Sequence, residues 1–307
     1  MTSVRPTIVV IGNFDGVHRG HRAVIEAARA DAADGGRVVA VTFHPHPLTV
    51  IRPDLAPNLL CSIEERCALL REAGVDEVVV VEFTREVMNS SPEEFVASVL
   101  VPLHPTKVVV GKNFTFGRKA VGTPATLAEI GAGSFTVEAL DLVDDASSTE
   151  ARHALVDGDV QRAADILGRP YRFSGEVVKG DQRGRELGFP TANVLVPPAR
   201  AVPADGVYAG WLTAHCTAPG VGDIALPAAI SVGTNPTFDG VQRRVESYVL
   251  DRTDLELYGV TVDVDFVARL RGQVKYTGID PLIAQITADV VDTRTALGLP
   301  DSRPLLR

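Results

Sequence analysis

The sequence predicts an α/β domain followed by a domain built mainly of β-strands. In the first half, short apolar runs alternate with helical patterns, which is typical of a doubly wound parallel sheet. In the second half, short strands are separated by clusters of Gly, Pro and Asp, which favours a closed antiparallel β-barrel. The chain has 307 residues, a length that suits two domains.

The first half contains four candidate strands and three candidate helices. The strands are β-branched runs suited to a sheet covered on both faces, at residues 8–11, 38–43, 77–83 and 107–110. Helical patterns lie between them at 21–33, 63–73 and 92–101, and Ser91 with Glu94 forms a helix-capping signature. Such sheets bind ligands at the carboxyl ends of their strands.

A pair of short helices is expected next, at residues 151–156 and 159–167, ending at Gly168. Arg169 and Pro170 break this pattern, so we predict domains at 1–168 and 169–307. The expected barrel strands are 173–178, 206–213, 225–231, 244–250 and 261–270. A terminal helix is expected at 281–297, with an apolar stripe that we interpret as core packing: Leu282, Ile283, Ile286, Val290 and Leu297.

Composition and charge exclude several classes of protein. The net charge of −9 argues against general nucleic-acid binding. No apolar stretch is long enough to cross a bilayer and no signal-peptide pattern opens the chain, so we expect a cytoplasmic protein without membrane association. The three cysteines fit no metal spacing, and we interpret Cys61 and Cys67 as helix-side packing residues. An anionic substrate would need a local positive pocket.

The segment 12–21 is the most informative motif of the first half. It follows an apolar strand and opens a helix, and it carries His18 and His21 three residues apart, on one helix face. Unpaired backbone N–H groups at a helix start attract anions, and glycines allow close approach of a nucleotide. We therefore predict a phosphate site that uses both histidines, with Asn13 assisting. The weaker alternative is a pair of polar residues capping a surface helix.

Three further segments accompany this motif. Residues 42–47 carry His44 and His46 between prolines, and a functional role and a rigid loop are equally compatible with that pattern. Residues 111–117 follow a strand, where an α/β sheet binds ligands. In residues 147–152, hydroxyls at a helix start could hold a triphosphate while an arginine neutralises it, although for this segment alone an ordinary helix cap is a strong alternative. The residues concerned are Ser147, Ser148, Thr149 and Arg152.

The second half carries a glycine-spaced basic loop between residues 175 and 193. Its glycines expose backbone N–H groups, and positive charge comes from Lys179, Arg183 and Arg185, so Lys179, Gly180 and Gly184 are predicted to bind phosphate. Thr191 and Asn193 offer neutral oxygens to a hard cation that phosphate also holds. A flexible hairpin with a surface charge cluster is the alternative.

Glu246 stands in a strand between Val245 and Ser247. It is either a general base or a solvated strand carboxylate, and the spacing alone does not choose.

Together these motifs resemble the bacterial bifunctional riboflavin kinase/FAD synthetase family over nearly the whole chain. The resemblance implies an N-terminal Rossmann-like nucleotidylyltransferase domain that makes FAD from FMN, with His18 and His21 as its paired histidines. It implies that residues 111–117, with Asn113 and Phe114, contact flavin. It also implies a C-terminal riboflavin kinase barrel, in which Thr191 and Asn193 contact Mg²⁺–ATP and Glu246 is the catalytic glutamate.

The implied substrates and products are ATP, riboflavin, FMN and FAD, with Mg²⁺ as cofactor. The expected partners are these small molecules, and self-association is left open. Two alternatives remain. One is a riboflavin kinase whose N-terminal module is impaired in adenylyl transfer, motivated by Ala146, Glu150 and Ala151 around the serine motif. The other is a flavin carrier without chemistry, which would need neither the phosphate loop nor Glu246.

Overall fold

The computed structural model describes residues 5–32, 35–141, 146–180, 184, 187–215, 223–237 and 240–300. The chain divides into two compact units, Met1–Ser148 and Thr149–Arg307. Each unit is described by itself. The helical pair that precedes residue 168 belongs to the second unit, and the domain limit at 168 stays a prediction.

The first unit is built on a five-stranded parallel sheet in the order β3-β2-β1-β4-β5. The strands are β1 (Thr7–Ile11), β2 (Arg37–His44), β3 (Glu77–Glu82), β4 (Lys107–Gly111) and β5 (Thr136–Leu140). Four of them match the expected strands. β5 was missed because its sequence, Thr-Val-Glu-Ala-Leu, mixes polar and apolar residues and lies at a sheet edge. The expected doubly wound parallel sheet is confirmed.

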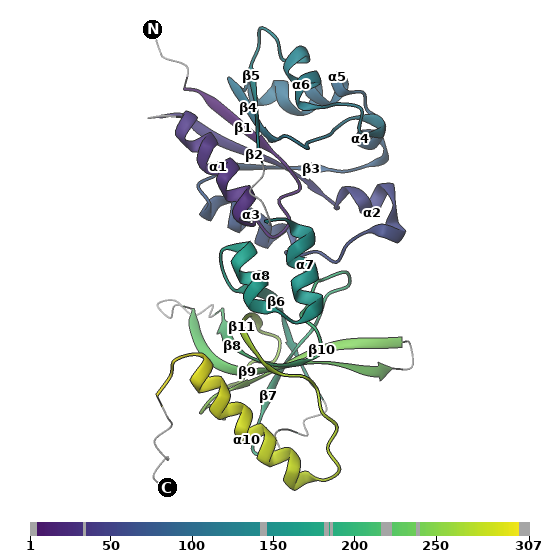
Figure 1. The fold of residues 1–307 in the computed structure, drawn as a ribbon. Coiled ribbons are helices and arrows are strands. Elements are labelled where there is room, and N and C mark those ends of the chain that lie inside the picture. Colours follow the sequence, from purple (N-terminus) through teal and green to yellow (C-terminus); the bar gives the residue numbers. More distant parts are fainter. Residues whose placement is uncertain are drawn as a thin grey trace. The chain divides into compact units, whose positions relative to one another are not determined.

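Both faces of this sheet are covered, which explains the near-continuous apolar strands. Ile8 and Val10 face a core shared with helices α1 (Arg19–Ala32) and α3 (Ile63–Glu72). Val9 and Ile11 face the opposite core, which α5 (Pro92–Phe95) and α6 (Pro124–Ile130) help to form. Figure 1 shows α1 and α3 on one side of the strands and α5 and α6 on the other.

Local signals set the helix boundaries. Ser62 with Glu65, and Ser91 with Glu94, make reciprocal capping boxes at the starts of α3 and α5. The expected helix at 92–101 is irregular, because α5 passes into a π-helical turn at Val96–Leu100 and a 3-10 turn at Val101–Leu103. The remaining elements are α2 (Pro47–Ile51), α4 (Arg85–Asn89) and 3-10 turns at Pro53–Leu55 and Arg118–Ala120.

The second unit begins at Thr149, the second residue of α7 (Ser148–Asp157), and continues with α8 (Val160–Leu167), which contacts two strands of a closed six-stranded barrel. The barrel order is β10-β7-β6-β11-β8-β9, and every pairing is antiparallel. The strands are β6 (Tyr171–Val178), β7 (Thr191–Val194), β8 (Gly206–Ala214), β9 (Ile224–Thr237), β10 (Gly240–Val249) and β11 (Thr261–Arg271). The expected barrel is confirmed, and β7 is a strand that sequence analysis missed.

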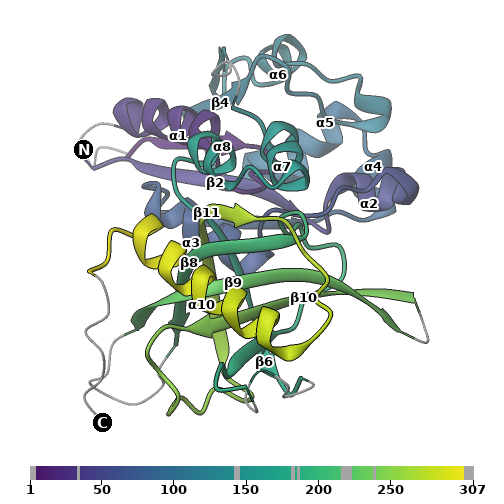
Figure 2. The same ribbon diagram turned by 60° about the horizontal axis from the view of Figure 1, so that its bottom comes forward.

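The terminal helix α10 (Ile279–Ala296) lies along the barrel, where it contacts β8, β9 and β11 (Figure 2). Its buried residues are polar: Asp289, Thr293 and Arg294. Asp289 accepts two hydrogen bonds from Arg271, at 2.7 and 2.6 Å, and Arg294 pairs with Asp251. The stripe that begins at Leu282 is half-buried, so it packs less deeply than we expected, and the fully buried positions of the helix are the polar ones.

Candidate active sites

The histidine motif follows β1, and the 111–117 motif follows β4. β1 and β4 are neighbours at the centre of the sheet, with β2 and β3 beyond one and β5 beyond the other. The strand order therefore reverses between them. Open α/β sheets bind ligands at the carboxyl ends of their strands at such a switch point. The topology thus brings both motifs to the position where a ligand is expected.

The turn after β1 has an unusual backbone. Phe14, Gly16 and Val17 all have positive φ, at 49°, 78° and 41°. For a β-branched residue such as Val17 this conformation is strained, costing on the order of 1–3 kcal/mol. Strained backbone persists only where surrounding contacts fix it, and such strain is concentrated at functional sites.

His18 and His21 lie against each other at the start of α1. Their rings are stacked with centroids 3.6 Å apart, and the ring of Phe14 meets His21 edge-on at 5.1 Å. Burial, the neighbouring His18 and the charge of Arg66 hold the pKa of His21 well below its usual value. The Nδ1 atom of His21 is buried and has no hydrogen-bond partner among the residues that the structure describes. The pair thus places a neutral His21, with an unused ring nitrogen, beside the N-terminus of a helix.

A buried ionic network underlies this turn. Asp15 and Arg66 are each 1% exposed, with Arg66 Nη2 4.0 Å from Asp15 Oδ1. Asp15 also accepts hydrogen bonds from the backbone N–H groups of Leu60 and Cys61. Cys61 precedes α3 and its Sγ accepts from the Gly16 N–H at 3.1 Å, so it is not on a helix as expected.

Sequence analysis missed Arg66. The available signal was its spacing of four residues from Leu70, which places both on the buried face of α3.

The other residues expected around the phosphate are placed as follows. Asn13 is exposed, and its carbonyl accepts from Thr42 Oγ1 at 3.1 Å. Ser147 and Ser148 close the first unit, and the Ser148 hydroxyl donates to the carbonyl of Asp15 at 2.8 Å. The structure thus brings the serine motif against the histidine turn.

Thr149 and Arg152 belong to the second unit, and their positions relative to the histidines are not determined.

The predicted flavin-side residues flank the same sheet edge. Asn113 is exposed, whereas the half-buried Phe114 stacks on Phe116 with ring centroids 5.5 Å apart. His44 is exposed, and the buried His46 accepts from the Leu48 N–H as the cap of α2. For His46 a structural role is therefore sufficient.

In the barrel, the predicted metal and base residues lie on adjacent strands. Glu246 on β10 is the register partner of Asn193 on β7, and Tyr248 is the partner of Thr191. Directly opposite residues of an antiparallel pair project from the same face, with Cβ atoms about 5 Å apart. Alternation along β7 puts Thr191 and Asn193 on that face together. The structure therefore groups Thr191, Asn193 and Glu246.

The glycine-spaced loop approaches the same strand. A Cβ added to Gly180 would lie 2.4 Å from Asn193 Oδ1, and one added to Gly184 would lie 2.5 Å from the carbonyl oxygen of Phe189. A side chain at Gly184 would therefore collide with backbone, whereas one at Gly180 would force the Asn193 side chain to shift. Lys179 is exposed beside them, and Arg183 and Arg185 lie outside the described residues.

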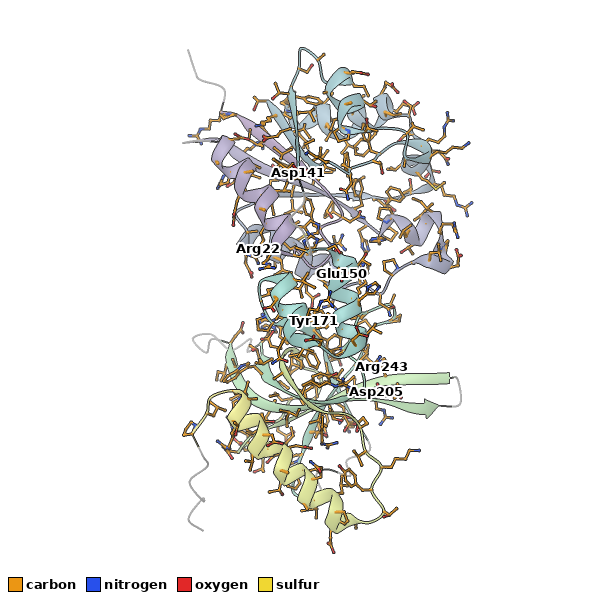
Figure 3. The ribbon with its side chains drawn as sticks, in the orientation of Figure 1. Arg22, Asp141, Glu150, Tyr171, Asp205 and Arg243 are labelled. Atoms are coloured by element: carbon orange, nitrogen blue, oxygen red, sulfur yellow. The ribbon has the colours of Figure 1, made fainter. Side chains whose placement is uncertain are left out.

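Two cavities are lined by residues of these strands. A small one is lined by Thr191 and Asn193 together with apolar side chains of Val177, Val249, Leu255 and Leu257. A larger one, of about 450 Å³, is lined by Glu246 with Arg244, Ser231, Gln273 and Lys275. Asp205 also lines it and is held by Arg243, whose Nη2 lies 2.9 Å from Asp205 Oδ1 (Figure 3). Arg244 and Gln273 are site residues that sequence analysis did not identify.

The donor set at β7 fits a hard cation only in part. The Thr191 hydroxyl and the Asn193 amide oxygen are the oxygen ligands that Mg²⁺ accepts, and the carboxylate of Glu246 faces them. Within the described part of the chain, no group of three or more His, Cys, Asp or Glu side chains could hold a metal. A Mg²⁺ ion here would therefore share its ligands between the protein and a phosphate.

The fold and these two sites define a two-domain, phosphate-binding transferase: an α/β nucleotide-binding unit joined to a barrel with its own glycine-lined phosphate loop. Family profiles agree with this division. The FAD synthetase family matches residues 1–151 and the riboflavin kinase family matches residues 167–297.

Curated relatives are similar over almost their full length. The bifunctional riboflavin kinase/FMN adenylyltransferase of Listeria monocytogenes is 38% identical, over 94% of this chain and 91% of the relative. The enzyme of the same name from Escherichia coli is 35% identical over 95% and 93% of the two chains, and that of Bacillus subtilis is 34% identical over 92% and 90%. The chain belongs to the bifunctional riboflavin kinase/FMN adenylyltransferase family.

One solved structure has the same fold over nearly the whole chain. It is titled a macrolide-efflux protein from Streptococcus pneumoniae, and it matches with a TM-score of 0.84 and 31% identity, covering 96% of this chain and 95% of its own. In this chain, none of the helices in the described ranges has the length and apolar character needed to span a membrane.

Proposed function

We propose that the barrel phosphorylates riboflavin to FMN and that the α/β unit joins FMN to the AMP part of ATP, giving FAD and pyrophosphate. Family membership supports both activities, since the two family profiles fall on the two halves of the chain. The observation that carries the assignment of residues is the pairing of Glu246 with Asn193, beside a loop whose Gly180 packs on the Asn193 side chain.

In the kinase reaction, Glu246 acts as the general base. The ribityl 5′-hydroxyl of riboflavin must lose its proton as it attacks the γ-phosphate of ATP, and a carboxylate at hydrogen-bond distance accepts that proton. The large cavity that Glu246 lines is the expected flavin side, and the small cavity beside Thr191 is the expected nucleotide side. In this assignment the proton acceptor is the strand neighbour of Asn193, which lines the nucleotide side.

Thr191 and Asn193 would hold Mg²⁺ together with the phosphates of ATP. When bound, the ion neutralises charge on the transferred phosphoryl group. The backbone N–H groups of the loop with Lys179, Gly180 and Gly184 orient the phosphates. A side chain at Gly184 would collide with the Phe189 carbonyl, and one at Gly180 would displace the Asn193 side chain from its proposed role.

In the adenylyl transfer, the protein needs no general base. The FMN phosphate is already ionised near neutral pH, so positioning and charge stabilisation carry the reaction. His18, His21 and the α1 N-terminus bind the triphosphate, with Asn13, Ser147, Ser148, Thr149 and Arg152 assisting. Asn113 and Phe114 contact the flavin. The switch point between β1 and β4 supports this arrangement.

A time course with riboflavin, ATP and Mg²⁺ tests the proposal directly. Chromatography should show FMN first and FAD later. Substituting His21→Ala should abolish FAD while FMN still forms. FMN formation without any FAD in the wild type would favour the alternative of a kinase with an impaired N-terminal unit. Absence of both products and of ADP would favour a flavin carrier.

The remaining expectations belong to the same proposal. The partners are the small-molecule substrates, with no nucleic acid and no membrane, and the place of action is the cytoplasm. The acidic net charge supports the expectation that the protein does not bind nucleic acid. Self-association is tested by light scattering of the purified protein.

A further inference from the structure

The buried arginine beneath the histidine turn has more contacts than a packing role requires. Arg66 lies on α3 and is 1% exposed. Its Nη1 donates to Thr42 Oγ1 at 3.3 Å and to the Phe43 carbonyl at 3.0 Å, and its Nη2 faces Asp15 at 4.0 Å. Removing a guanidinium from water is costly unless hydrogen bonds and an opposite charge compensate. Arg66 thus connects three elements: α3, the carboxyl end of β2 and the turn after β1.

Two of these contacts, those to Thr42 and Asp15, lead into the turn that carries the histidines. Thr42 Oγ1, which accepts from Arg66, in turn donates to the Asn13 carbonyl at 3.1 Å. Asp15, which faces the Arg66 charge, is followed by Gly16 and Val17, two of the three residues with positive φ. The strained turn is therefore held from both of its sides by one side chain.

The turn in turn fixes the histidines. His18 follows Val17 directly, and the ring of His18 accepts a contact from the His21 backbone N–H at 3.4 Å while stacking on the His21 ring. Gly20 has room for no side chain without crowding His18, since an added Cβ would lie 3.1 Å from its ring. A small change in the backbone at residues 15–17 would therefore move both rings.

We infer that Arg66 is a positioning residue for adenylyl transfer, which holds the turn at Asn13–Val17 so that His18 and His21 meet the nucleotide in a fixed geometry. It acts through Asp15 and Thr42 and does not itself touch the substrate. This inference rests on the proposed FMN adenylyltransferase site. It adds a residue that neither the motif nor its spacing identifies.

The test compares three variants of the full-length protein, each supplied with FMN, ATP and Mg²⁺. Arg66→Met keeps the length of the side chain and removes its charge and donors. It should lower kcat for FAD formation about 100-fold, the cost of misplacing reacting groups by about 1 Å, with KM for ATP and FMN within about threefold of wild type. Arg66→Lys keeps the positive charge, so its kcat for FAD formation should be at least about tenfold higher than that of Arg66→Met. Arg71→Met, on the exposed face of α3, is the matched control and should equal the wild type.

The outcomes separate this inference from the proposed function. Riboflavin phosphorylation by the same preparations reports on the barrel and should not change. Failure of the wild type to make FAD would remove the proposed function itself. If the wild type makes FAD and Arg66→Met has the same kcat, the inference is overturned. It is also overturned if Arg66→Met and Arg66→Lys lower kcat for FAD formation equally.

A second variant decides if Arg66→Met does not fold. Thr42→Val removes only the hydroxyl that Arg66 and the Asn13 carbonyl share, and valine suits a buried strand. A fall in kcat of about tenfold at unchanged KM supports the inference, in line with the loss of one hydrogen bond from a positioning network. A wild-type kcat in Thr42→Val overturns it.

Discussion

Glu246 lies directly opposite Asn193, where β10 runs antiparallel to β7. The pairing sets a carboxylate and an amide oxygen on one face of the barrel wall, next to the loop that carries Gly180. The proposed base and the proposed phosphate-side ligand are therefore held by backbone hydrogen bonds rather than by flexible loops. Rigid strands suit a reaction in which a proton and a phosphoryl group must move between fixed partners.

Replacing the proposed base should remove kinase turnover. Glu246→Gln keeps the shape of the side chain but cannot accept the hydroxyl proton, so kcat for FMN formation should fall at least about 100-fold. Riboflavin binding, measured by fluorescence quenching, should stay close to wild type. Glu176→Gln, on the exposed face of β6, serves as control and should be fully active. Undiminished turnover in Glu246→Gln would rule out a general-base role.

The phosphate loop should not tolerate a methyl group at its first glycine. In Gly180→Ala, the new Cβ would lie 2.4 Å from Asn193 Oδ1, so the loop or Asn193 must move. We expect kcat/KM for ATP in the kinase reaction to fall by about 10- to 100-fold, since we propose that both groups contact the triphosphate. FAD formation from supplied FMN should be unaffected. Gly272→Ala is the control, because nothing lies within 4 Å of its added Cβ; equal rates in the two variants would contradict the close contact.

The pKa of His21 should respond to Arg66. In the wild type, burial is the largest cause of its lowered pKa, followed by His18 and then Arg66. Removing the Arg66 charge in Arg66→Met should therefore raise the His21 pKa, yet leave it below its usual value of about 6.5 because burial remains. A ¹H–¹⁵N NMR titration of the imidazole measures this. An identical pKa in wild type and Arg66→Met would show that the charge does not reach the ring.

The same lowered pKa makes the first unit sensitive to acid. In the unfolded chain His21 takes up a proton as the pH falls through about 6.5, whereas the folded state resists protonation until a lower pH. The free energy of unfolding should thus decrease with falling pH between these two pKa values. Urea titrations at pH 7.5 and 5.5 should show a larger loss for the wild type than for His21→Gln. Equal losses would argue against a neutral, buried His21.

His215 in the barrel should show the opposite sign. Partial burial acts to lower its pKa, but the hydrogen bonds and charges of Asp263 and Asp223 outweigh burial and raise it. Its stabilising contribution is complete below the unfolded pKa of about 6.5 and is lost as the pH rises through the higher folded pKa. The Tm difference between wild type and His215→Gln should therefore be larger at pH 6 than at pH 9. A difference that grows with pH would refute the ion pairs.

Strong periodic signals were readable from the sequence. The apolar runs that became β1, β2, β3 and β4 were identified because both faces of a covered parallel sheet demand β-branched residues. The helix starts at Ser62 and Ser91 were equally readable, since a capping box depends on residues three apart. The motifs at His18 and Asn193 could be located because they place histidines, glycines and neutral oxygens next to predicted strands, where core packing requires none of these residues.

Other features depend on tertiary contacts that no local pattern reports. β7 is only four residues long and is a strand because β6 and β10 pair with it on both sides. Arg66 resembles any charged residue of a surface helix until Asp15 and Thr42 are brought to it by the sheet. The apolar stripe of α10 indicated the face that packs on the barrel, but the ion pairs that bury Asp289 and Arg294 there depend on Arg271 and Asp251, which are distant in sequence.

The polar attachment of α10 has a consequence for how that helix can change. Apolar contacts are non-directional and let a helix shift along its neighbour. A bidentate guanidinium–carboxylate pair such as Arg271 with Asp289 instead fixes the orientation of the two side chains. Adding one residue between Asp289 and Arg294 would rotate the two anchors about 100° out of phase. Length changes should therefore be excluded between these anchors during divergence of the family, while the outward side chains of α10 are free to vary.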